Sequence, residues 1–102
     1  MTTTPEGKVK AKIDKVLKSY PNSQVWYFNP QSGIYGRSGV PDKIICANGH
    51  FIGVEVKSDK SKHPTRLQEQ CMTKITEAGG VCFVVYDDDT LHTLVEYIEK
   101  CL

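Results

Sequence analysis

The sequence lacks any apolar run long enough to cross a membrane as a helix, and it lacks the hydrophobic segment of a secretory signal. Its four cysteines are widely spaced and form no C-x-x-C pair, so neither a zinc site nor a disulfide-rich scaffold is indicated. Internal repeats, low-complexity stretches and linkers are also missing. We therefore expect residues 1–102 to form a single cytoplasmic domain that is not secreted and has no membrane partner.

The residue pairings of covalent catalysis are missing as well. The three histidines show no metal-ligand spacing with cysteine or with one another, and no serine or cysteine can be paired with a histidine from spacing. Three of the cysteines lie in apolar segments, where a free cysteine behaves as a small hydrophobe, so we expect reduced core residues. A covalent intermediate is not indicated.

The most informative segment is a predicted hairpin. Residues 42–47 and 50–57 are rich in β-branched and aromatic residues, and they flank the dipeptide Asn48-Gly49. That dipeptide is the strongest short signal for a two-residue type I′ turn. The turn sets the pairing of the strands so that Asp42 lies opposite Glu55, with the two Cβ atoms about 4.5–5.5 Å apart.

Two carboxylates on one rung repel each other unless a proton or a cation relieves the repulsion. Ligands that are all oxygen favour Mg²⁺, or Mn²⁺ in its place, over zinc. Lys57 shares a face with Glu55 and can hold a water or an anionic substrate. The alternative is a solvated hairpin face with ordinary carboxylate and lysine pairs, and a bulge would break the register.

The charges are unevenly distributed along the chain. Residues 1–66 hold eleven Lys and Arg against five Asp and Glu, a balance of +6, whereas residues 67–102 hold two against seven, a balance of −5. Beside a divalent-metal site, such asymmetry indicates a basic face turned toward nucleic acid. A uniformly solvated surface remains the alternative.

A first helix is predicted by apolar residues at helical spacing from Val9 to Tyr20, and Pro21 ends it. If the helix begins by residue 6, Glu6 lies on the inward stripe, where an acid needs a partner. Its alternative role is that of a first-turn acid favoured by the helix dipole.

Residues 24–28 are predicted to form the first strand, and residues 29–40 a glycine-containing loop that leads to Pro41. Arg37 and Ser38 in this loop are candidates for contacts with phosphate, although an ordinary loop arginine is an equally good interpretation.

A polar, basic connection follows Lys57 and suits the phosphate backbone of a nucleic acid. Its candidate contacts, together with the first arginine of the next helix, are Lys60, Lys62, His63 and Arg66. We expect Pro64 to open this second helix and Gly79-Gly80 to end it. Gln68 can reach the rim of the site, and the expected inner stripe is Leu67, Cys71, Ile75 and Ala78.

The apolar run 81–86 predicts a strand buried on both faces and near the centre of the sheet. Asp87-Asp88-Asp89 is expected to cap a last helix, because consecutive residues at a helix start cannot all converge on a metal. The predicted fold is α/β, with element order αβββαβα and a mixed sheet flanked by helices. This core uses all the apolar positions, so no dimer interface is evident.

Four segments in this order resemble the PD-(D/E)XK nuclease superfamily, and specifically its VRR-NUC family: Gly39-Val40-Pro41-Asp42, Glu55-Val56-Lys57, Gln68 and Ala78-Gly79-Gly80. The resemblance covers nearly the whole chain and implies a restriction-endonuclease-like core. It implies Asp42 and Glu55 as metal ligands. It also implies that Lys57 orients or activates the water and steadies developing charge, with Gln68 in support.

The resemblance further implies that Glu6 completes the metal site and that the backbone carbonyl of Val56 is another ligand. The implied activity is Mg²⁺-dependent hydrolysis of phosphodiesters in DNA. Family members made of this domain alone are bacterial or phage proteins similar in layout to dimeric Holliday-junction resolving enzymes, which implies a homodimer that cuts branched DNA. The alternatives are a nuclease for flaps, nicks or plain duplex, an inactive DNA-binding module, and a domain with no nucleic-acid role.

Overall fold

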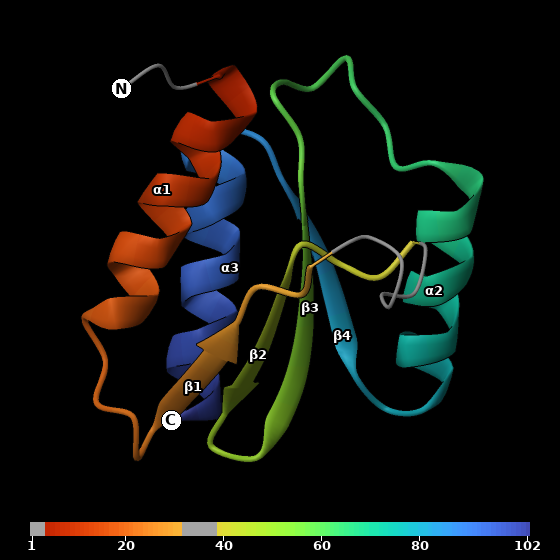
Figure 1. The fold of residues 1–102 in the computed structure, drawn as a ribbon. Coiled ribbons are helices and arrows are strands. Elements are labelled where there is room, and N and C mark those ends of the chain that lie inside the picture. Colours follow the sequence, from red (N-terminus) through yellow and green to blue (C-terminus); the bar gives the residue numbers. More distant parts are fainter. Residues whose placement is uncertain (1–3, 32–38) are drawn as a thin grey trace.

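Figure 1 shows the computed structural model of the chain, which describes residues 4–31 and 39–102. Its elements are α1 Pro5–Lys18, β1 Val25–Phe28, β2 Lys43–Ala47, β3 His50–Val56, α2 Arg66–Glu77, β4 Val81–Val85 and α3 Asp88–Cys101. The predicted order αβββαβα is confirmed. In the described parts of the chain, no helix is long and apolar enough to cross a membrane.

The strands form one mixed sheet in the order β1-β2-β3-β4. β2 is antiparallel to both β1 and β3, whereas β4 runs parallel to β3 after the crossover through α2. Asn48 and Gly49 have φ values of 48° and 86°, the positive values that a type I′ turn requires. Ala47 pairs with His50, so the predicted hairpin register is confirmed.

Helices cover both faces of this sheet. α1 and α3 lie together on one face, and α2 packs against β3 and β4 on the other (Figure 1). The apolar core fills the space between the sheet and the α1/α3 pair. Its buried members are Ile13, Leu17, Val25, Ile45, Ala47, Ile52, Val54, Val56, Val85, Leu94, Ile98 and Cys101.

β4 is an edge strand, so the prediction of a central strand is wrong. Only Val85 in it is buried, and the other four side chains are half-buried. The apolar run is explained by the two faces of the strand, because α2 packs on one face and α3 on the other. A strand can therefore be apolar on both faces because helices cover them, even though, among the described residues, only β3 pairs with it.

α2 begins at Arg66, and Pro64 therefore precedes the N-cap, Thr65, rather than opening the helix. The Thr65 hydroxyl accepts from the Gln68 N–H at 3.2 Å, and the Gln68 side chain accepts from the Thr65 N–H at 2.7 Å. This reciprocal pair is a capping box, and it gives Gln68 a local reason to turn back along the helix.

The predicted inner stripe of α2 is wrong at Leu67 and Ala78, both of which are exposed; Leu67 is 55% exposed. The inward positions are half-buried and follow helical spacing: Gln68, Cys71, Met72 and Ile75. The predicted positions Cys71 and Ile75 do face inward, but Gln68 and not Leu67 faces the sheet at the start of the helix.

Part of the sheet face on the α2 side is open at β1 and β2. Trp26 pairs with Cys46 and Cys46 with Phe51, which places these three side chains in one row. Trp26 is 53% exposed, Phe28 45% and Phe51 44%. The expectation that the core uses every apolar position is therefore wrong, because α2 lies over the β3/β4 side of the sheet. Cys46 is likewise exposed and not a core residue.

Candidate active site

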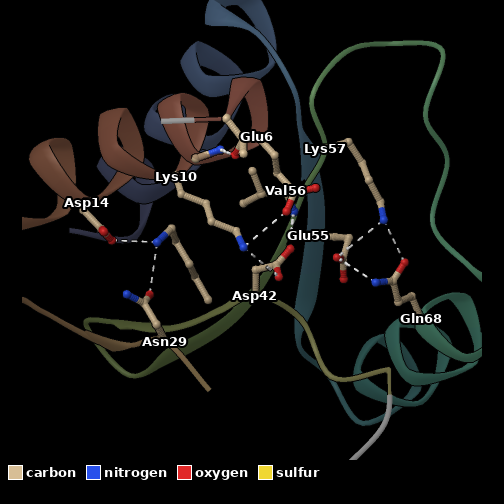
Figure 2. A network of polar contacts seen from close by, with 12 residues as sticks. Glu6, Lys10, Asp14, Asn29, Asp42, Glu55, Val56, Lys57 and Gln68 are labelled. Atoms are coloured by element: carbon tan, nitrogen blue, oxygen red, sulfur yellow. Dashed lines mark hydrogen bonds and ion pairs between the residues drawn. The ribbon is translucent and has the colours of Figure 1, made fainter. Parts of the chain in front are cut away.

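The candidate site lies where the start of β2 meets the end of β3. The last pair between these strands joins Lys43 to Val54, and one further rung places Asp42 beside Glu55. Asp42 Oδ2 accepts a hydrogen bond from the Val56 backbone N–H at 2.7 Å (Figure 2). This bond fixes the Asp42 carboxylate against β3 through the N–H of Val56.

Glu55 is the most unusual group in the site. It is only 1% exposed, and its Oε2 has no hydrogen-bond partner among the described residues. Burial, followed by the neighbouring carboxyl group of Asp42, raises the pKa of Glu55 to about 8 against a smaller opposing effect of Lys57. A carboxyl group in this position needs a proton or a cation to satisfy it.

A single amide connects Glu55 to Lys57. Gln68 Nε2 donates to Glu55 Oε1 at 3.0 Å, and Gln68 Oε1 accepts from Lys57 Nζ at 3.0 Å (Figure 2). Lys57 Nζ also lies 3.9 Å from Glu55 Oε1. The capping box already orients the Gln68 amide, so the start of α2 positions both the acid and the ammonium.

Glu6 lies in the first turn of α1, which begins early enough for the predicted inward orientation. Its carboxylate is 3.3 Å from Lys10 Nζ, and that ammonium is 3.7 Å from Asp42 Oδ1. Glu6 therefore reaches the same end of the sheet and also helps to raise the pKa of Glu55. In residues 4–31 and 39–102, no three His, Cys, Asp or Glu side chains are grouped closely enough to hold an ion together.

Comparisons with known proteins place this geometry in a known fold. No family model and no curated protein matches the chain, but solved structures do. One described as "VRR_NUC domain" has a TM-score of 0.77 and 25% sequence identity, covering 93% of this chain and 98% of that one. The chain has the VRR-NUC fold. A second structure, "VRR_NUC domain protein", has a TM-score of 0.76 and 16% identity, with 99% of this chain and 93% of the other covered.

The resemblance inferred from the sequence motifs is thereby confirmed, as is the mixed α/β sheet flanked by helices. The VRR-NUC domain is a domain of nuclease type. Within it, the structure brings together five of the predicted site residues at one end of the sheet: Glu6, Asp42, Glu55, Lys57 and Gln68.

The predicted DNA contacts that fall within the described residues lie around that end. Lys60, Lys62, His63 and Arg66 are all exposed. The first three belong to the connection that leaves the site after Lys57 and arches over to α2 (Figure 1). Arg37 and Ser38 lie outside the described residues.

Sequence reasoning missed a second polar cluster next to Asp42. Lys43 is 1% exposed, and its Nζ donates to Asp14 Oδ1 at 2.6 Å and to Asn29 Oδ1 at 3.1 Å. Glu6, Lys10 and Asp14 lie four residues apart on α1 and so share one face of the helix. That spacing of alternating charges is the signal in the sequence that could have revealed the cluster.

A close backbone contact holds α2 against the segment that carries Asp42. Gly39 has a φ of +82°, and a Cβ built on it would lie 2.6 Å from the Leu67 carbonyl oxygen. The first turn of α2 therefore approaches the chain just before Pro41, and only glycine fits there.

We expect Gly39→Ala to destabilise the fold by roughly 1–3 kcal/mol, the usual cost of forcing a non-glycine residue into such a conformation, with the contact to Leu67 adding to it. Urea unfolding measures the effect. Gly49→Ala is the matched control, since its φ is +86° but a Cβ there meets nothing within 4 Å. Equal losses in the two variants would contradict the role of the close contact.

Proposed function

We propose that the chain is a metal-dependent DNA endonuclease that hydrolyses phosphodiester bonds. The observation that carries the proposal is the Glu55 carboxyl, which is buried beside Asp42. One of its oxygens has no partner in the part of the chain that the structure describes, and the other accepts from Gln68. Two carboxylates that need a cation, with the ammonium of Lys57 next to them, suit the hydrolysis of a phosphodiester. A metal ion and an ammonium both stabilise negative charge on the phosphate. The VRR-NUC fold supports the same activity.

The donor set fits Mg²⁺, with Mn²⁺ able to replace it, because it consists of oxygen atoms. Asp42 and Glu55 would be the primary ligands, and the backbone carbonyl of Val56 and the carboxylate of Glu6 would be the further donors. A divalent ion in such a site lowers the pKa of a bound water and polarises the scissile phosphate.

The protein's own groups hold this arrangement. The Val56 N–H fixes the Asp42 carboxylate, and the Gln68 amide fixes the carboxyl of Glu55. An ammonium has three donors, and Lys57 donates to Gln68, so further donors can reach a water or a phosphate oxygen. Lys57 thus orients the water and stabilises the negative charge that develops during in-line attack.

The exposed basic connection is the proposed contact with the DNA backbone. Lys60, Lys62, His63 and Arg66 lie on it or just after it. Arg37 and Ser38, which precede Gly39 in the sequence, are further candidates. Phosphate contacts of this kind give an affinity that falls as salt rises.

The preferred substrate is branched DNA, and the active form is a homodimer. A twofold dimer presents two equivalent sites to two strands of a symmetric junction.

The open row of Trp26, Cys46 and Phe51, with Phe28 beside it, is the candidate interface. A stable dimer of standard size covers about 800 Å² on each partner. A monomer in sedimentation would remove the dimer from the proposal and leave the nuclease standing.

The deciding experiment is cleavage of a labelled four-way junction beside its matched linear duplex, in Mg²⁺ and in EDTA. We expect strand cleavage of the junction in Mg²⁺ alone, supported also by Mn²⁺. Equal cutting of the duplex would remove branch selectivity, and cutting of flaps or nicks in preference would change the substrate. Salt-dependent binding without cutting of any of these substrates would contradict the activity and favour an inactive DNA-binding module.

A further inference from the structure

Lys10 occupies a position that the proposed mechanism does not use. Its ammonium lies 3.3 Å from Glu6 Oε2 and 3.7 Å from Asp42 Oδ1, between two of the acids proposed to hold the metal (Figure 2). A positive charge therefore already stands between carboxylates that belong to different elements, one on α1 and one at the start of β2.

The fold, and not side-chain freedom alone, places this ammonium. One turn further along α1, Asp14 binds the buried ammonium of Lys43, the residue after Asp42. Asn29, beyond the end of β1, accepts from the same ammonium. These contacts fix the register of α1 against the start of β2, and Lys10 is thereby held opposite Asp42.

The surroundings also leave room for Lys10 to move. A pocket of about 220 Å³ adjoins Asp42, and Lys10, Asp14 and Lys43 are among the residues that line it. The Lys10 side chain is 39% exposed, so it can leave the carboxylates without opening the core.

We propose that Lys10 is a resident counter-ion of the acidic site, whose ammonium pairs with Glu6 and Asp42 in the metal-free protein and competes with the divalent ion. The inference rests on the proposed function for the identity of the metal ligands. Its physical basis is that the ammonium and a divalent ion both relieve the repulsion of these acids by pairing with the same oxygens, so a metal ion has to displace the ammonium. The resident charge keeps the acids in place before metal arrives and weakens the binding of metal.

The test is Mg²⁺ binding to Lys10→Met by titration calorimetry in the absence of DNA. Methionine keeps most of the length and removes the charge. We expect roughly fivefold tighter binding, about 1 kcal/mol at 1.4 kcal/mol per factor of ten. In EDTA the variant should unfold at a lower temperature than the wild type, and Mg²⁺ should raise its unfolding temperature by more.

Lys12→Met is the matched control, because Lys12 lies on the same helix and pairs with Asp88 at 2.9 Å, away from the site. It should bind Mg²⁺ as the wild type does. Lys10→Gln provides a second uncharged variant if the methionine variant does not fold. Unchanged or weaker Mg²⁺ binding in the Lys10 variants would overturn the inference alone, whereas absence of Mg²⁺ binding in every protein, wild type included, would overturn the metal site together with it.

Discussion

Lys57→Met is expected to lower the rate of Mg²⁺-dependent cleavage at saturating DNA by about 10²- to 10³-fold, the usual loss when one group that stabilises developing charge is removed. The physical reason is the position of the ammonium, which Gln68 holds beside Glu55. DNA affinity should fall no further than in any variant that loses a single phosphate contact, because the other contacts remain. Single-turnover cleavage of the labelled junction, with binding measured separately in EDTA, gives both quantities.

Lys60→Met is the control that separates this effect from loss of positive charge in general. Lys60 is exposed and lies in the same connection, three residues after Lys57. Its replacement should weaken DNA binding, lower the slope of affinity against salt by about 1, and leave cleavage of the saturated complex unchanged. If both variants cut at the wild-type rate when saturated, Lys57 is not part of the reaction and its assignment fails.

The parts of the site that could be predicted are those fixed by local sequence. Asn48-Gly49 determines the turn, the turn determines the register, and the register brings Asp42 opposite Glu55. Alternation along the strand then places Lys57 on the same face as Glu55. None of these steps requires knowledge of how distant elements pack.

The parts that failed depend on packing between elements far apart in the sequence. The apolar pattern of α2 predicted Leu67 on the inner stripe, whereas Gln68, which was expected at the rim of the site, faces the sheet and contacts Glu55 and Lys57. The apolar run of β4 indicates that both faces of the strand are covered. Helices provide that cover, so the strand can still lie at the edge of the sheet. The position of Lys10 could not be predicted, because its partner Asp42 belongs to another element far along the chain.

Glu55→Gln is expected to abolish Mg²⁺-dependent cleavage and, in EDTA, to make the fold more stable above neutral pH. The pKa of Glu55 is raised from 4.5 to about 8, chiefly by burial. The folded protein therefore keeps this proton up to about pH 8, whereas the unfolded chain releases it near pH 4.5. Because the folded state binds more protons between these values, the free energy of unfolding of the wild type falls as pH rises through this window.

The glutamine variant keeps the shape and the acceptor for Gln68, and it places an amide N–H₂ in the position of the carboxyl oxygen that has no partner among residues 4–31 and 39–102. It carries no charge at any pH, so its stability should lack the wild-type decline. Near pH 9 we expect it to exceed the wild type by a few kcal/mol, since each unit of pKa difference corresponds to about 1.4 kcal/mol.

Urea unfolding in EDTA at pH 5, 7 and 9 measures this prediction. Glu77→Gln is the matched control: Glu77 is exposed in the last turn of α2, so its loss should leave the wild-type slope intact. A wild type whose stability did not fall relative to Glu55→Gln between pH 5 and 9 would show that Glu55 ionises without penalty. The metal-dependent mechanism rests on the need for a cation at this carboxyl. That result would remove this basis, even if the protein cut DNA.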